Sequence, residues 1–148
     1  MNLKKQLQAD LKAAMRNQDA EKKSALRMVL SGIQYAEVEK SEELSDQDIL
    51  GVLQKEVRRR EDALAMIRDA GRDDLAAEEV AQLEILKAYL PTQLTVDEIT
   101  TLAKTVIAEV GAASPSDVGM VMKDLMPQVK GKADGRMVNQ VVRDLLAV

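Results

Sequence analysis

Residues 46–70 have the sequence DQDILGVLQKEVRRREDALAMIRDA, and their apolar positions decide the fold. These positions recur at spacings of three, four and seven residues: Leu50, Leu53, Val57, Leu64 and Ile67. This is the period of one face of an α-helix. Ser45 and Asp48 form a helix-start pattern before the stretch, and Gly71 suits its end. The sequence therefore predicts a long amphipathic helix here.

The chain before this helix continues the same period. Two further apolar series predict two helices: Leu3, Leu7, Leu11 and Met15, then Leu26, Val29, Leu30, Ile33 and Ala36. Asp19 is predicted to cap the second of them. The polar segment 40–45, KSEELS, is predicted to be a loop.

The chain after residue 70 shows four more helix signals. A fourth helix is expected to stop before Pro91, which disfavours helix at the preceding residue. Thr95 starts a fifth helix with a capping box, and Ser114-Pro115 start a sixth. Pro127 is expected to close the sixth helix or to lie just past its end, and Asp134 is expected to cap a seventh. The seventh is predicted to complete the core with Met137, Val138, Val141, Val142, Leu145 and Leu146.

These elements predict an all-α fold with no strand pattern of useful length. An N-terminal four-helix unit, residues 1–90, is expected to precede a small three-helix C-terminal domain, residues 96–148. Residues 91–95, PTQLT, are predicted to be the linker. Three short helices enclose a small core, so this domain is expected to lean on the first one or on a partner.

The composition excludes several classes of chemistry. The 148 residues include no Cys and no His, which rules out disulfides, thiol nucleophiles, imidazole triads and the usual zinc sites. No cofactor and no metal site is predicted, and no catalytic residues emerge, because nothing singles out a pair of carboxylates. The N-terminus lacks the apolar core of a signal peptide, and no run is long enough to cross a membrane. A cytoplasmic location without membrane contact is the resulting prediction.

The net charge of −4 does not favour binding to nucleic acid, so any contact with nucleic acid must depend on a local patch of basic residues. The segment 123–143 provides one, with five basic and two acidic residues. Arg136, Gln140 and Arg143 share one helix face, and Lys130 and Lys132 flank Gly131 in the loop before that helix. Free amides, the helix dipole and these cations would favour a phosphate. The alternative is that the glycines only make turns and the cations only solvate a surface.

Two other basic features allow an ordinary interpretation. Residues 58–60 are three consecutive arginines, which point in different directions around their helix because successive residues are about 100° apart. Ion pairs on the helix surface, such as Glu56 with Arg60, are therefore favoured over a ligand site. A weak secondary basic surface is formed by four cations of the first two helices: Lys12, Arg16, Lys23 and Arg27. A solvated amphipathic face is the favoured explanation there, with RNA contact as the alternative.

Several motifs in order resemble one known family. These are LRMV at 26–29, VLQKEVRRREDA at 52–63, AGRDDL at 70–75, LEILKAYLPTQLT at 83–95 and EVGAASPSDVG at 109–119. The chain is similar over nearly its full length to YqeY-like proteins of the GatB/YqeY family. Residues 117–146 resemble the tail domain of the GatB component of the aspartyl/glutamyl-tRNA amidotransferase.

The resemblance implies a helical N-terminal domain and a three-helix tail associated with binding the tRNA body. It also places Asn139 in the characteristic tail motif of the family, which covers the loop before the last helix and the start of that helix. The candidate RNA-binding residues are then Lys123, Lys130, Gly131, Lys132, Gly135, Arg136, Asn139 and Arg143. The family offers no established catalytic residue for the free-standing protein.

The leading hypothesis is a tRNA-interacting accessory protein that binds the RNA backbone without catalysis of its own; DNA is not an expected partner. The first alternative is an adaptor that docks on a tRNA synthetase or on a component of the amidotransferase. The second is a carbon–nitrogen ligase with glutamine as amido donor, which the missing Cys and nucleotide-binding motif disfavour.

Overall fold

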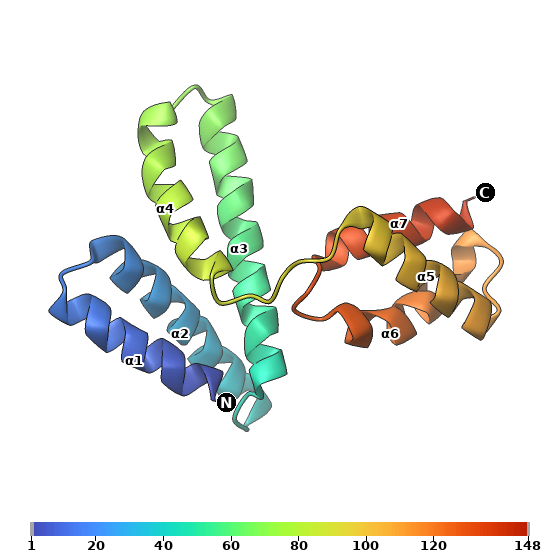
Figure 1. Ribbon diagram of the computed structural model, residues 1–148, viewed down its shortest axis with the longest axis horizontal. Helices are drawn as coiled ribbons and strands as arrows, with labels where there is room; N and C mark the ends of the chain where they lie inside the picture. Colours follow the sequence, from blue (N-terminus) through green and yellow to red (C-terminus); the bar gives the residue numbers. More distant parts are fainter. Residues whose placement is uncertain (1, 148) are drawn as a thin grey trace. The chain divides into compact units, whose positions relative to one another are not determined.

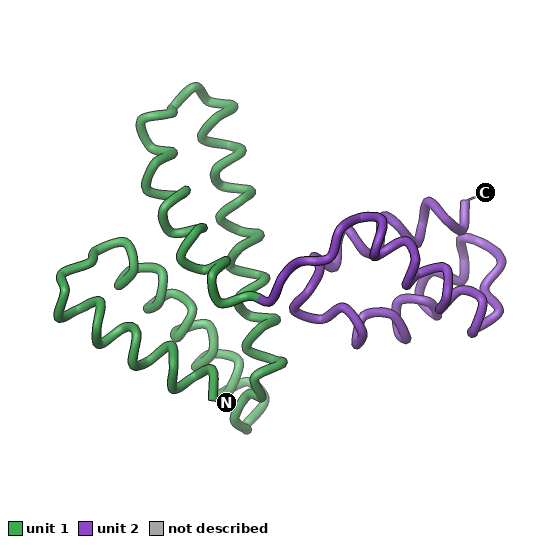
Figure 2. Tube along the Cα trace, in the orientation of Figure 1, with its two compact units in different colours: residues 1–90 green, residues 91–148 purple. Residues whose placement is uncertain are grey.

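The computed structural model describes residues 2–147, which form seven α-helices and two 3₁₀ turns and no strand (Figure 1). This confirms the all-α prediction. The helices are α1 Leu3–Arg16, α2 Ala20–Lys40, α3 Asp46–Asp69, α4 Ala76–Lys87, α5 Val96–Val110, α6 Val118–Val129 and α7 Gly135–Leu146. The 3₁₀ turns are η1 Asp73–Leu75 and η2 Pro115–Asp117. The chain divides into two compact units, residues 1–90 (unit 1) and 91–148 (unit 2), shown in Figure 2.

Unit 1 consists of two helical hairpins, α1 with α2 and α3 with α4 (Figure 1). Its core is aliphatic and includes the fully buried Leu7, Leu26 and Leu53. Local capping fixes the helix starts: the side chain of Asp19 accepts from the amide of Lys22, and Ser45 forms the predicted capping box. These short-range hydrogen bonds satisfy backbone groups that a helix end leaves unpaired.

Glu37 of α2 joins three parts of unit 1. Its carboxylate accepts from Lys4 Nζ of α1 at 2.7 Å and from the amide of Leu44 in the following loop at 3.0 Å. The hydrogen bond from Lys4, together with that from the amide, holds the pKa of Glu37 below its ordinary value.

Tyr89, just past the end of α4, is tied to α1. Its hydroxyl donates to Asp10 Oδ2 at 2.5 Å. Burial, with the hydrogen bond to this carboxylate, raises the pKa of Tyr89 far above its ordinary value. The phenol therefore stays protonated and acts as a donor.

We expect Tyr89→Phe to lower the free energy of unfolding by about 1–2 kcal/mol, because a hydrogen bond to a charged acceptor is lost. Urea denaturation followed by circular dichroism measures the change. Tyr35→Phe is the matched control, because Tyr35 is 70% exposed and its hydroxyl has no partner among the described residues. Equal stability of Tyr89→Phe and the unmodified protein would contradict the expectation.

The arginine run differs from its prediction at one residue. Arg60 does not pair with Glu56 on its own helix; its Nη1 donates to Glu79 Oε2 of α4 at 3.1 Å, and Arg60 is only 8% exposed. Glu56 instead accepts from Arg59 at 3.2 Å. Position 60 lies on the core-facing side of α3, so the facing helix supplies the nearer carboxylate.

Unit 2 packs α5, α6 and α7 around a core that includes Ile99, Leu125 and Val142, all fully buried. Thr95 forms the predicted capping box, and Asp134 caps α7. The segment before α5 is hydrogen-bonded to the loop before α7, as described below.

Two predictions for unit 2, those for Pro127 and Met137, are wrong, and the predicted start of the sixth helix is confirmed. Pro127 lies inside α6, which continues to Val129, because the full burial of Val129 outweighs the local preference of proline to end a helix. Ser114 caps the start of this helical segment, as predicted, through a capping box with Asp117. The first turn, Pro115–Asp117, is the 3₁₀ turn η2, and α6 follows directly from Val118. Met137 is 42% exposed, since it lies about 100° around α7 from the buried Val138.

Candidate nucleic-acid interface

The outward face of α7 presents the predicted cationic stripe. At about 100° per residue, Arg136 and Arg143 fall within about 20° of one another, on the side opposite the buried Val138 and Val141. Both arginines are exposed. Gln140 lies between them and donates to Asp144 at 2.9 Å. The two arginine positions are therefore about 10 Å apart along the helix axis on one solvent face.

The entrance of α7 is occupied by a carboxylate. Asp134 Oδ1 accepts from the amide of Arg136 at 2.9 Å, and Oδ2 lies 3.8 Å from Arg136 Nε. A carboxylate at this position is favourable because of the helix dipole. The side chain of Asp134 thus takes the place that the sequence pattern suggested for a phosphate, and it also pairs with Arg136.

The loop before α7 is held by backbone hydrogen bonds. The amides of Lys132 and Ala133 both donate to the carbonyl of Val129, at 2.8 and 3.0 Å. Gln93 Nε2 donates to the carbonyl of Gly131 at 3.0 Å, and the amide of Leu94 donates to that of Lys132 at 2.8 Å. Gly131 is buried with φ +82°, a conformation that glycine adopts without strain. The glycine therefore shapes the turn that leads into α7.

The candidate residues therefore differ in accessibility. Four cations are exposed: Lys123, Lys132, Arg136 and Arg143. Three residues are half-buried: Lys130, Gly135 and Asn139. The sequence predicts the stripe on α7 and the cap at Asp134, whereas the burial of Gly131 depends on loop geometry that spacing does not report.

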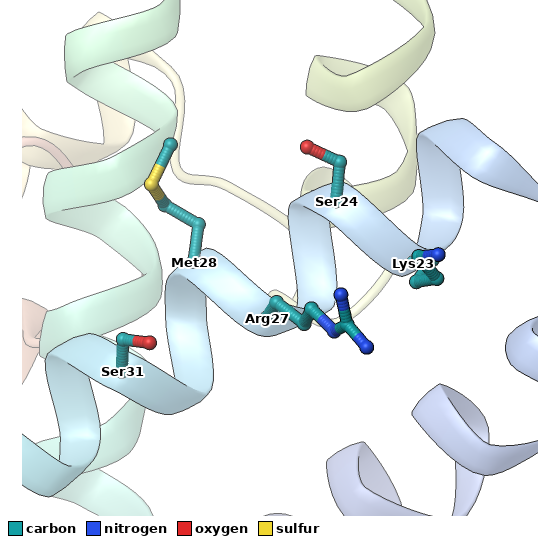
Figure 3. A pocket seen from close by; sticks show the side chains of 5 residues that line it. All are labelled: Lys23, Ser24, Arg27, Met28 and Ser31. Atoms are coloured by element: carbon teal, nitrogen blue, oxygen red, sulfur yellow. The ribbon is translucent and has the colours of Figure 1, made fainter.

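The secondary basic surface divides between two helices. Lys12 and Arg16 are exposed on α1, and Lys23 and Arg27 line an open hollow of about 410 Å³ along α2 (Figure 3). The other residues that line it are Ser24, Met28 and Ser31. Sequence reasoning did not single out these three, although their spacing from Lys23 and Arg27 places them on the same helix face.

The described part of the chain holds no cluster of metal ligands. Among residues 2–147, no group of three or more acidic side chains is arranged to bind a metal ion. None of the helices in this range is long and apolar enough to cross a membrane.

The fold and this interface define a small all-α protein of two helical units with a cationic helix face. The sequence model of the YqeY-like protein family matches residues 4–146, and the chain belongs to this family. This confirms the resemblance to YqeY-like proteins.

Curated fungal proteins are similar to the chain over most of its length. "Altered inheritance of mitochondria protein 41, mitochondrial" of Pyrenophora tritici-repentis is 29% identical over 143 residues, covering 95% of this chain and 78% of the relative. The protein of the same name in Lachancea thermotolerans is 32% identical, covering 89% and 68%. That of Saccharomyces cerevisiae strain YJM789 is 29% identical, covering 89% and 63%.

The cytoplasmic prediction is wrong by this comparison. Relatives that align with most of the chain are named mitochondrial proteins, which points away from the cytoplasm. Composition misled the prediction, because a sequence without Cys is compatible with more than one compartment.

Proposed function

We propose that this protein is a non-catalytic accessory protein that binds the backbone of a folded RNA through unit 2. The proposed binding surface consists of Arg136 and Arg143 on the outward stripe of α7, Lys132 in the loop before it, and Lys123 on α6. The finer architecture, a four-helix domain followed by a three-helix one, belongs to the same proposal and is supported by the two compact units.

One observation supports this function above all others. Lys123, Lys132 and Arg143 are exposed, and their side chains have no hydrogen bond or ion pair within residues 2–147. A cation without a carboxylate partner is available to a phosphate oxygen without first breaking a pair. Unit 2 has no aromatic side chain, since both tyrosines lie in unit 1, so recognition would depend on phosphates and shape.

The resemblance of residues 117–146 to the amidotransferase tail makes tRNA the RNA that we propose. A domain of this kind would contact the tRNA body while a synthetase or the amidotransferase performs the chemistry. The chain itself would contribute affinity and orientation.

The test is a tRNA titration of the full chain at several salt concentrations. We expect Lys132→Ala and Arg143→Ala each to weaken binding and to reduce the slope of log K against log salt by about one unit. Lys104→Ala is the matched control, because Lys104 is an exposed cation of unit 2 on α5, outside the candidate set. Slopes that do not change in either variant would refute the proposed surface.

Exposed methionines favour a second candidate function, an adaptor for a protein partner. Met120 and Met137, both in unit 2, are 44% and 42% exposed. Methionine adapts to irregular partner surfaces. Capture of a synthetase or of an amidotransferase component that survives nuclease and high salt, and that Met120→Glu abolishes, would favour this function over RNA binding.

A further inference from the structure

The solvent face of α2 has an unusual composition. We call it the α2 outer face, and at about 100° per residue it spans an arc of about 140°. Its members are Lys23, Ser24, Arg27, Met28, Ser31, Gln34, Tyr35 and Val38. The opposite side of the helix holds the buried Leu26, Val29 and Ile33. The helix contains three acids, and none of them falls within the arc: Glu21 and Glu39 lie just outside its Met28 edge, and Glu37 pairs with Lys4.

Every polar side chain on this face can donate a hydrogen bond, and none is a carboxylate. Lys23 and Arg27 make no ion pair with any residue from 2 to 147. They line the open hollow together with the hydroxyls of Ser24 and Ser31 (Figure 3). Such a set of donors matches the oxygens of a phosphodiester backbone.

The same face presents one of the chain's two aromatic rings. Tyr35 is 70% exposed, whereas Tyr89 is half-buried and bonded to Asp10. Tyr35 lies about 12 Å along the helix axis from Arg27. An exposed ring beyond a pair of cations is the arrangement by which proteins hold unpaired nucleotides, with the base stacked and the phosphates neutralised.

We propose that the α2 outer face binds an unpaired nucleic-acid strand, with Lys23 and Arg27 on the phosphates and Tyr35 stacked on a base. An acidic helical peptide fits less well, because Met28 and Val38 lie about 80° and 15 Å apart and form no continuous apolar groove. This surface belongs to unit 1, so the proposal is independent of the tRNA contact proposed for unit 2.

Tyrosine fluorescence tests the proposal in the full chain, which contains no Trp. In the Tyr89→Phe variant all emission comes from Tyr35, and stacking is expected to quench it when octauridylate is added. Tyr35→Ala is expected to weaken binding about tenfold and Tyr35→Phe to leave it unchanged, with affinity read from a labelled oligonucleotide. Lys23→Ala and Arg27→Ala should each reduce the salt slope by about 0.7.

Lys55→Ala and Arg68→Ala are the matched controls, because both residues are exposed cations of α3 in the same unit. A parallel titration with octathymidylate distinguishes RNA from DNA as the source of the strand. The proposal is overturned if neither oligonucleotide quenches Tyr35 at low salt, or if Tyr35→Ala binds as well as Tyr35→Phe. It is also overturned if polyglutamate binds equally well, or if Arg143→Ala in unit 2 abolishes oligonucleotide binding.

Discussion

Replacing Leu125 by Ala is expected to lower the free energy of unfolding of unit 2 by about 2–5 kcal/mol. The side chain is fully buried at the centre of the three-helix core. A unit of about 60 residues has a total stability of roughly 3–9 kcal/mol, so this one substitution removes a large part of it. The expected result is a much lower unfolding temperature for this unit, measured by calorimetry.

Met120→Ala is the control for this experiment. Met120 lies on the same helix but is 44% exposed, and we expect its truncation to change stability by less than about 0.5 kcal/mol. Comparable losses in the two variants would contradict the core that the structure describes.

Glu79→Ala is expected to lower the free energy of unfolding by about 3 kcal/mol, whereas Arg60→Met is expected to change it by less than about 1 kcal/mol. Arg60 is buried and Glu79 is its only ion-pair partner among the described residues, so losing that carboxylate leaves a buried charge without compensation. Losing the guanidinium instead leaves a carboxylate that is one-quarter exposed and can be hydrated.

Urea denaturation of the two variants checks this order. Glu78→Ala is the control, because Glu78 is the exposed neighbour of Glu79 on the same helix. A larger loss of unfolding free energy in Arg60→Met than in Glu79→Ala would contradict this order. It would show that the ion pair stabilises unit 1 by more than the cost of burying its charges.

Local signals in the sequence predict much of this fold. The caps at Asp19, Ser45, Thr95 and Asp134 act over two or three residues, so a sequence pattern contains all the information they require. The pairing of Arg60 with Glu79 joins residues on different helices, and helix periodicity does not determine which side chain of α4 faces position 60. Long-range packing likewise extends α6 past Pro127.

The candidate interface likewise combines features that the sequence predicts with features that depend on tertiary structure. Spacing alone puts Arg136 and Arg143 on one face, because both are on a single helix. The buried, positive-φ position of Gly131 depends on how the loop before α7 turns, and the exposure of Tyr35 depends on which face of α2 the core covers. Neither property is encoded in a short motif.

The hydrogen bonds from Gln93 and Leu94 have a practical consequence for dissecting the protein. These bonds anchor residues 91–95 to the turn that leads into α7. A fragment that starts at Thr95, where the capping of α5 begins, would lose both anchors and release that turn. A fragment meant to retain the cationic face in its native form should therefore start at Pro91.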